Sequence, residues 1–468
     1  MSFSNCINQA VQEFKNLNKR PVRLIGHLDS DGLCSTSILI QVLQREGFKF
    51  VVSVVKQVTD DLLELVSKED YNTVFFVDLG SGSLDSINKI LKNKQVFILD
   101  HHIPSEKNTH SIHINPLLFG IDGNKEISGA GVVYLFAKEL DKKNIDLAHL
   151  ALIGAVGDMQ ENKGFKGINN DIILNDAISS GVLEVRKGLT LFGSQTRPLH
   201  KILEYSTDPY IPNVTGSEIG SIKFLEDLGI PIKEGKKFKK LVNLNEDDMK
   251  KLITGIILRR LGSEDKPEDI LGPIYLLKNE DNESPTKDLK EYSTLLNSCG
   301  RLGKYSLGIG ACLSLKKCRE DAIELLKSYK LEIIKSLDWF YKNKKSKFVI
   351  ENPNYIIVNA GDNVKDTFIG TITSIISRSN IYKEGVLLIS MAYTIDGDIK
   401  VSLRCTGYKK SSTDLKELIS KIIKKIGSGI AGGHYGAAGA LIPQNDESLF
   451  IKTCREILDN EVIQESVE

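Results

Sequence analysis

Acidic and histidine side chains, the groups that bind metal ions or move protons, follow four apolar stretches of this sequence. In "QVFILDHHIP" the apolar residues 96–99 end at Asp100, His101 and His102. The other three stretches end in "HLDSDG", in "VDLGSG" and in "GDMQ", and they supply His27, Asp29 and Asp31, then Asp78, then Asp158. Because four separate elements each end in an acid, the sequence predicts that these side chains meet at one site.

The elements that carry these residues follow the pattern of a βαβ architecture. Short β-branched runs at 21–27, 49–56, 73–78, 95–100 and 110–115 are expected strands, and 33–47, 128–143 and 146–158 are expected helices. The pattern predicts an α/β fold with a doubly wound, mainly parallel sheet, which binds ligands at the carboxyl ends of its strands. If the first strand stays extended to Asp31, then Asp29 and Asp31 share one face of it.

A partly buried group of carboxylates costs several kcal/mol per uncompensated charge, so the site should hold cations. Carboxylate together with imidazole favours Mn²⁺, with Mg²⁺ or Zn²⁺ as weaker fits. Two such ions about 3.5–4 Å apart would activate water for phosphodiester hydrolysis. Each acid alone is most often a cap or turn residue, so only the agreement of the four endings supports a site.

The composition limits the class of protein. The chain has 468 residues, 41% hydrophobic and 26% charged, enough for two or three domains. Lys+Arg and Asp+Glu both number 61, so the overall charge gives no indication of a nucleic-acid partner. A local basic groove remains an open alternative. The seven cysteines contain no C-x-x-C pair, and neither a signal peptide nor a membrane span is visible. We therefore expect a cytoplasmic protein without a membrane partner.

The four motifs "HLDSDG", "VDLGSG", "LDHH" and "GDMQ" resemble, in this order, those of the DHH phosphoesterase superfamily. "VSLRCTG" and "GGHYGAAGA" resemble the motifs of its companion C-terminal domain. Within the superfamily the chain is similar to archaeal RecJ-like proteins, which include the GINS-associated nuclease. The segments "SGAGVVYLF", "RPLHKILEYSTDPYIP" and "TLLNSCGRLGKYSLGIGACL" carry this likeness, which is weakest over about 210–285.

The resemblance implies a cleft with two Mn²⁺, or Mg²⁺ in their place. His27, Asp29 and Asp78 correspond to ligands of one ion, and Asp31, His101 and Asp158 to ligands of the other, with Asp78 bridging the two. Asp100 would orient His101, and His102 would lie near the scissile phosphate. In the C-terminal domain, Gly432 and Gly433 would expose N–H groups to a phosphate, which His434 and Arg404 would also hold. The residues alone leave a tight glycine turn as the alternative, and Ala431 stands where the family often has a third glycine.

Four regions are expected along the chain: a DHH catalytic domain at 1–204, a mainly helical insert at 205–300, a helical linker at 301–347, and a smaller α/β DHH-associated domain at 348–468 that binds substrate. The resemblance implies a manganese-dependent exonuclease that degrades single-stranded DNA from 5′ to 3′ in DNA replication or repair. Three alternatives stay open. They are 3′-to-5′ degradation of RNA, a scaffold that binds GINS and the replicative helicase through the insert, and a phosphodiesterase of short oligonucleotides.

Overall fold

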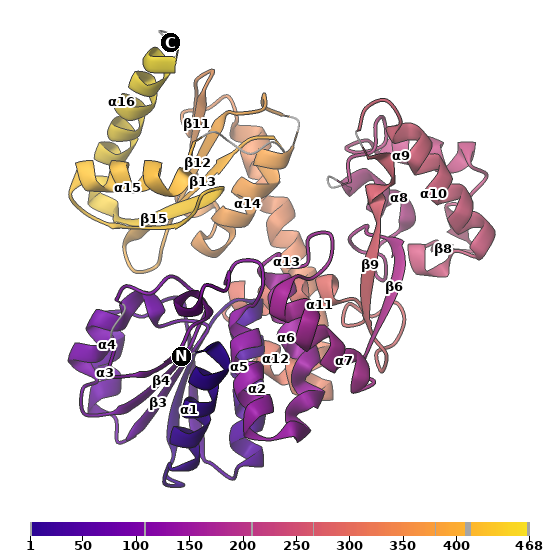
Figure 1. The fold of residues 1–468 in the computed structure, drawn as a ribbon. Coiled ribbons are helices and arrows are strands. Elements are labelled where there is room, and N and C mark those ends of the chain that lie inside the picture. The colour runs from indigo at the N-terminus through magenta and orange to yellow at the C-terminus, as the bar shows by residue number, and fades with distance from the viewer. Residues whose placement is uncertain are drawn as a thin grey trace. The chain divides into compact units, whose positions relative to one another are not determined.

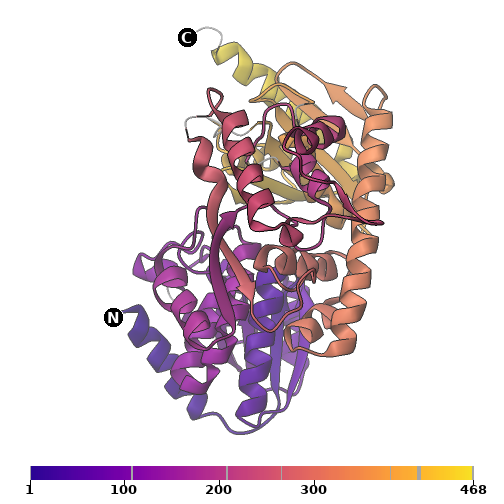
Figure 2. The ribbon, with the colours of Figure 1, turned by 90° about the vertical axis from the view of Figure 1, so that its right-hand side faces the viewer.

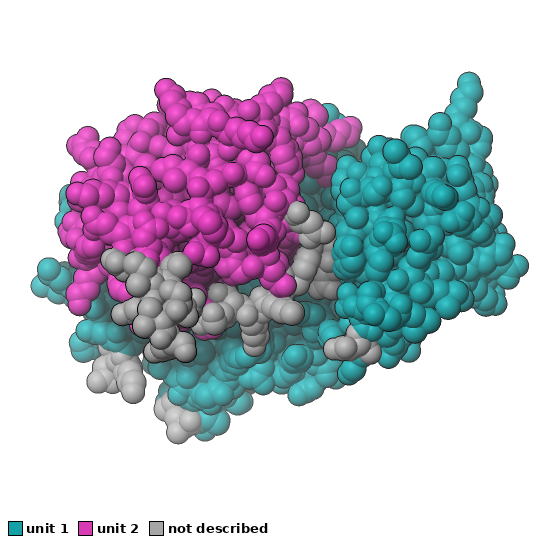
Figure 3. All heavy atoms as spheres, turned by 90° about the horizontal axis from the view of Figure 1, so that it is seen from above, with its two compact units in different colours: residues 1–326 teal, residues 327–468 magenta. Residues whose placement is uncertain are grey.

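The computed structural model describes residues 2–106, 109–206, 209–264, 266–379, 381–407 and 413–465, without the side chains of His434 and 460–465. The chain forms two compact units, residues 1–326 and 327–468, which Figure 3 shows in different colours. The long helix α13 (Lys316–Asn343) contains the boundary between them. No helix in the described ranges is both long and apolar enough to cross a lipid bilayer.

The first unit is built on a five-stranded parallel sheet. Its strand order is β2 (Phe50–Val55), β1 (Val22–His27), β3 (Thr73–Val77), β4 (Gln95–Leu99) and β5 (Ile112–Ile114). The chain runs outward from β1 in one direction to β2 and in the other to β3, so the topological switch point lies between β1 and β3. All five strands expected from the sequence are present, which confirms the fold class.

Helices cover both faces of this sheet (Figure 1). On one face, α3 (Asp60–Lys68) and α4 (Leu84–Ile90) bury an apolar cluster that includes Phe76 and Ile98. On the other face lie α1 (Phe3–Lys15), α2 (Ser30–Arg45) and α5 (Gly129–Leu140), with α6 (Ala148–Gly157) packed against α2 and α5. Gly47 follows α2 with a φ of 72°, the left-handed conformation with which glycine commonly ends a helix.

After the short helix α7 (Asn175–Ser179) the chain leaves this domain through an antiparallel ribbon, β6 (Leu183–Leu189) paired with β9 (Leu271–Leu277) (Figure 2). Between these strands lie α8 (Leu199–Tyr205), α9 (Glu218–Asp227), the two-residue strands β7 (Lys233–Glu234) and β8 (Lys237–Phe238), and α10 (Glu246–Arg260). These helices bury an apolar cluster of their own, which includes Leu203, Phe224 and Leu252. The insert therefore has its own core.

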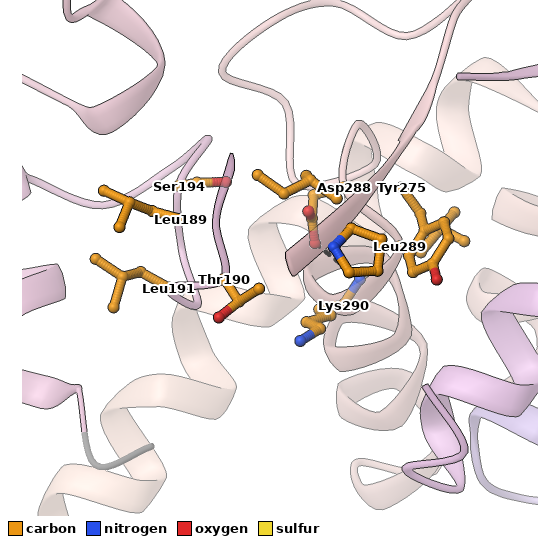
Figure 4. Close-up of a pocket in the computed structure, with 10 residues that line it drawn as sticks. Leu189, Thr190, Leu191, Ser194, Tyr275, Asp288, Leu289 and Lys290 are labelled. Atoms are coloured by element: carbon orange, nitrogen blue, oxygen red, sulfur yellow. Dashed lines mark hydrogen bonds between the residues drawn. The ribbon is translucent and has the colours of Figure 1, made fainter. Parts of the chain in front are cut away.

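Beyond the ribbon the chain returns to the parallel-sheet domain. Helix α11 (Leu289–Arg301) packs against α2 and α6, and α12 (Tyr305–Cys312) packs against α2. Where the ribbon meets α11, residues such as Thr190 and Ser194 line a small pocket opposite Tyr275 and Asp288 (Figure 4). Residues 289–300, which the sequence placed at the end of the insert, thus pack against α2 and α6 of the parallel-sheet domain.

The second unit has a mixed six-stranded sheet. Its order is β10 (Val349–Glu351), β11 (Tyr355–Asn359), β12 (Leu387–Tyr393), β13 (Asp398–Cys405), β15 (Ala437–Pro443) and β14 (Ile430–His434). Helix α14 (Asp366–Arg378) packs on β12 and β13, while α15 (Leu415–Ile426) and α16 (Glu447–Glu465) share a core with the sheet. Strand β14 forms one edge.

Candidate metal centre

The strand register brings the ends of three neighbouring strands level. Gly26 of β1 pairs with Val77 of β3, and Val77 pairs with Leu99 of β4. The next residue in each strand is His27, Asp78 and Asp100, respectively. Because parallel strands in register end at the same edge, these three side chains start from one row beside the switch point.

The side chains at this edge form two overlapping groups. In one, His27 Nδ1 lies 3.0 Å from an oxygen of Asp29 and 3.3 Å from Asp78 Oδ2. In the other, His101 Nε2 lies 3.2 Å from Asp158 Oδ2, 3.8 Å from Asp31 Oδ2 and 3.3 Å from Asp78 Oδ1. The ligand atoms of His27, Asp29 and Asp78, like those of Asp31, His101 and Asp158, lie within 4.8 Å of one another. Asp78 therefore directs one oxygen toward each group.

Asp31 reaches this site from a helix and not from a strand. Strand β1 ends at His27, Asp29 caps α2 by accepting from Gly32 N at 3.0 Å, and Asp31 lies in the first turn of α2. The condition that the strand stays extended to Asp31 is therefore not met, because the cap at Asp29 starts helix α2 at Ser30. The carboxylate of Asp31 accepts hydrogen bonds from Gly129 N at 2.6 Å and Ala130 N at 3.0 Å, the first amides of α5. A helix N-terminus is a favourable partner for a carboxylate.

The two adjacent histidines are held by different partners. His101 Nδ1 lies 2.5 Å from the carbonyl oxygen of Gly123, so Nε2 points to the acids. Asp100 instead holds the His102 ring, whose Nδ1 lies 2.8 Å from Asp100 Oδ1, and accepts the backbone amides of both histidines. The ring of His101 is thus oriented by a carbonyl, whereas the sequence had assigned that role to Asp100.

Glycines allow two helices to approach the acids closely. A Cβ on Gly129 of α5 would lie 2.4 Å from Asp78 Oδ1, and one on Gly154 of α6 would lie 2.1 Å from Asp31 Oδ1. Real Cβ atoms do not come this close to other heavy atoms, so any side chain there would displace a carboxylate. Asp78 itself has a φ of 60°, a left-handed conformation that aspartate tolerates better than most residues.

Burial and mutual repulsion change the proton affinities of these groups. Burial, with Asp78 and Asp158 nearby, raises the pKa of Asp31 well above its usual range, and burial raises the pKa of Asp158 to about 7. Although burial alone would lower it, the neighbouring carboxylates raise the pKa of His101 well above its ordinary value. Asp29 and Asp78 have the same effect on the pKa of His27. Protons therefore compensate the negative charge of the centre, a role that divalent cations could take over.

Three atoms of the centre fit a metal site directly. His27 Nδ1, Asp78 Oδ1 and His101 Nε2 are buried and have no hydrogen-bond partner among the described residues. Buried polar atoms of proteins normally have partners, because leaving one unpaired costs about 1–3 kcal/mol. All three belong to groups that ligate divalent transition metals. The donor set therefore fits a divalent metal better than an empty polar cluster.

Helix α11 braces the turn that carries Asp29 and Asp31. The side-chain oxygen of Asn297 accepts the backbone N–H of Ser30 at 3.0 Å, across 267 residues of sequence. One turn further along α11, a Cβ on Gly300 would lie 1.8 Å from the carbonyl oxygen of Leu28. Contact of α11 with this turn therefore requires glycine at 300.

The sequence had not singled out three further residues that connect to the centre. Ser81 N donates to Asp100 Oδ2 at 2.9 Å, and the Ser81 hydroxyl lies 2.9 Å from His113 Nε2. Asn115 donates to the Ser81 hydroxyl and to the carbonyl oxygen of His102. Ser81 lies within "VDLGSG", so that motif held the signal, but the contact with β5 depends on strand order, which no local pattern reveals.

The residues expected to bind substrate in the second unit lie on neighbouring strands. Arg404 of β13 pairs with Ala437 of β15, and its Nε donates to Ser374 Oγ at 3.1 Å. Gly432 and Gly433 are exposed on the edge strand β14, where a Cβ on Gly432 would meet no atom within 4 Å. The segment is one strand of the β14–β15 hairpin and packs against α15, and its role in binding phosphate remains a prediction. The side chain of His434 lies outside the described residues.

Three protein-family models match three successive parts of the chain. Residues 21–155 match the model of the DHH family N-terminal domain, residues 191–271 a DHH-CID domain, and residues 352–460 a DHHA1 domain. An uncharacterized protein of Methanocaldococcus jannaschii is 32% identical over 448 residues, which cover 94% of each chain. The single-stranded-DNA-specific exonuclease RecJ of Haemophilus influenzae is 25% identical over 178 residues, 33% of this chain and 30% of that protein.

Two solved structures share the fold. RecJ of Thermus thermophilus in complex with Mn²⁺ aligns with a TM-score of 0.59 and 14% identity, over 98% of this chain and 54% of that one. CDC45 of Entamoeba histolytica aligns with a TM-score of 0.64 and 15% identity, over 98% of both chains. The class that emerges is an α/β protein with carboxylates and histidines gathered at the switch point of a parallel sheet. The chain belongs to the DHH superfamily, in which it is a RecJ-like protein.

Proposed function

We propose that the protein is a metal-dependent exonuclease that hydrolyses phosphodiester bonds of single-stranded nucleic acid, most specifically of single-stranded DNA from the 5′ end. The observation that carries the proposal is the convergence of six potential ligands, three of which each contribute a buried atom without a hydrogen-bond partner among the described residues. The name of the Haemophilus influenzae relative, a single-stranded-DNA-specific exonuclease, supports the substrate class.

Two divalent ions, Mn²⁺ or Mg²⁺, would be held by the two groups that share Asp78. His27, Asp29 and Asp78 form one group, and Asp31, His101 and Asp158 the other. The fold is shared with a RecJ described in complex with Mn²⁺, which supports this ion. Such a pair, when bound, activates a water molecule and stabilises the attacking and leaving oxygens of an in-line phosphoryl displacement.

The protein's own contribution beside the ions is the His102 ring. Burial alone would lower the pKa of His102, but Asp100 raises it to about 9, which favours the protonated ring. Because Nδ1 is held by Asp100 and the ring is 44% exposed, the Nε2–H can donate to a phosphate oxygen. His102 would thus stabilise the charge that develops on the phosphate, while Asp100 positions it.

The second unit would hold the strand being degraded. Gly432 and Gly433 leave the backbone of an edge strand accessible, and φ of 127° at Gly433 disfavours any side chain there. Arg404 of β13, separated from β14 by the one strand β15, adds a guanidinium to the same sheet. We propose that these groups, together with His434, contact phosphates of the substrate.

The test is digestion of matched single-stranded DNA and RNA labelled at either end, with Mn²⁺, with Mg²⁺ and with a chelator. Asp78→Asn serves as the inactive control, because asparagine also tolerates a left-handed φ. Release from the DNA 5′ end that requires metal and Asp78 would support the proposal. Release of nucleotides from the RNA 3′ end would show that the substrate is RNA and not single-stranded DNA. Cleavage only of chains a few nucleotides long would point to an oligonucleotide phosphodiesterase. Absence of all cleavage would refute it.

A second function is favoured by one observation, the likeness to CDC45 over 98% of both chains. We propose that the insert also binds replication partners, with GINS and the replicative helicase as candidates. Three apolar side chains of the insert, Ile219, Leu258 and Leu261, are 81%, 60% and 58% exposed. Co-purification of GINS with the Asp78→Asn protein, and its loss on changing Ile219 and Leu258 to serine, would separate this role from catalysis.

A further inference from the structure

An arginine lies over two exposed aromatic rings on the insert. The guanidinium carbon of Arg197 is 4.8 Å from the ring centroid of Phe192 and 5.9 Å from that of Tyr205. Phe192 is 38% exposed and Tyr205 54% exposed. Lys201 adds a second cation 5.7 Å from the Tyr205 ring. We name Phe192, Arg197 and Tyr205 the arginine–aromatic cluster.

Among the described residues, the guanidinium of this cluster has no anionic partner. Over the described ranges, the Arg197 side chain makes neither a hydrogen bond nor an ion pair, whereas Arg23, Arg45 and Arg319 each contact a carboxylate within 2.7 Å. Glu291 is the carboxylate that acts most strongly on the charge of Arg197. Its two oxygens already accept hydrogen bonds from Gln195 N and from the Thr196 hydroxyl. A guanidinium with five donors and partial burial is stabilised by an anion that it can bind.

The local backbone holds Arg197 in this position. Residues 193–197 form a turn in which Arg197 N donates to the carbonyl oxygen of Gly193 at 2.9 Å. Gly193 has a φ of 93°, and a Cβ there would lie 2.5 Å from Arg197 Cδ. Glycine therefore leaves the space in which the arginine stem lies, and the guanidinium is preorganised over the rings.

The turn is fixed to the helix that braces the metal centre. Glu291 of α11 binds Gln195 and Thr196, and Asn297 of the same helix binds Ser30 N beside Asp29 and Asp31. Six residues separate Glu291 from Asn297, a rise of about 9 Å along a helix. The arginine–aromatic cluster and the metal turn thus share one rigid support.

We propose that the arginine–aromatic cluster is a binding site for single-stranded nucleic acid, separate from the metal centre. A phosphate would contact the Arg197 guanidinium, and bases would stack on Phe192 and Tyr205. Stacking on exposed aromatic rings beside a cation is the chemistry by which single strands are bound without sequence preference. The inference rests on the proposed function for its polymeric ligand, but not for any catalytic step.

The experiment measures binding of a fluorescein-labelled oligothymidylate of about 20 nucleotides by anisotropy, with a chelator present so that no cleavage occurs. Arg197→Met keeps the stem and removes the charge, Tyr205→Ala removes one ring, and Tyr205→Phe retains it. The matched control is Arg259→Met, because Arg259 also lies over a ring, that of Phe224 at 5.5 Å, but contacts Asp227 at 3.4 Å.

We expect Arg197→Met and Tyr205→Ala each to weaken binding about tenfold or more, with Tyr205→Phe and Arg259→Met near wild type. Arg197→Met should also reduce the slope of log affinity against log salt by about 0.7, the value for one phosphate contact on a single strand. Equal losses in Arg197→Met and Arg259→Met would overturn the inference, as would an unchanged affinity in Tyr205→Ala. Displacement by an acidic peptide as effectively as by an oligonucleotide would also overturn it.

These outcomes are distinguishable from failure of the proposed function. If the wild type binds the strand through the cluster but cleaves no polymer, the proposed function falls and the binding site stands. If it cleaves polymers while all four variants bind like wild type, the binding site falls and the proposed function stands.

Discussion

Asp288 begins the helix that braces the metal turn, and its ionisation should control the stability of that helix. It caps α11 by accepting from Lys290 N at 2.8 Å and Glu291 N at 3.2 Å. Burial, reinforced by the nearby Glu291 carboxylate, raises the pKa of Asp288 from 3.8 to about 7. Asparagine makes the same cap but cannot ionise, so Asp288→Asn isolates the effect of the charge.

The sign follows from proton binding. Between about pH 4 and pH 7 the folded protein holds a proton on Asp288 that the unfolded chain has lost, so stability decreases as pH rises through this window. A difference of about three pH units between the two pKa values corresponds to at most about 4 kcal/mol at pH 8. Asp288→Asn should therefore gain up to that amount relative to wild type at about pH 8, and little at about pH 4.

The assay is hydrogen exchange of the α11 amides, corrected for intrinsic rates, because a chain of several domains does not unfold in one step. Asp414→Asn is the matched control, since Asp414 caps α15 with the same pair of hydrogen bonds, at 2.9 Å and 3.2 Å. If Asp288→Asn changes the protection of α11 equally at both pH values, Asp288 is not held protonated by its surroundings and the reasoning fails.

Three further predictions concern the metal centre. Gly300→Ala should push the Leu28 carbonyl aside and weaken Mn²⁺ binding about tenfold or more by calorimetry, whereas Gly370→Ala, whose Cβ would have only an ordinary contact at 3.7 Å, should not. Mn²⁺ affinity should rise with pH through about 7, the pKa of Asp158, and the proton released on binding should make the measured binding enthalpy depend on the ionisation enthalpy of the buffer; a pH-independent affinity would contradict this. His102→Gln should lower kcat about 100-fold while Mn²⁺ affinity stays unchanged, and an equal loss of both would show that His102 acts through the metal site.

The sequence was sufficient for the sheet and for the gathering of the acids. After one polar residue each, strands β3 and β4 are apolar at 74–77 and 96–99, and each is followed directly by an acid, at Asp78 and Asp100. Because parallel strands have to end at one edge, local pattern alone predicted which side chains meet. The roles of these side chains as ligands remain predictions.

The contacts that orient the site were beyond sequence reasoning. The carbonyl that holds His101 belongs to Gly123, and the amides that hold Asp31 belong to the start of α5. Backbone groups carry no residue signature, so neither partner could be recognised from residue type. The location of Asp31 in a helix followed from the cap at Asp29, which a reading of strand alternation overlooks.

The brace supplied by Asn297 has a consequence for biosynthesis. The turn that carries Asp29 and Asp31 leaves the ribosome 267 residues before the side chain that fixes its backbone. At about 5–20 residues per second, the interval is on the order of 10 to 50 s. During this time the parallel sheet can form, but its acidic edge lacks its last support, so the nascent chain should gain full affinity for metal only after the insert has been translated.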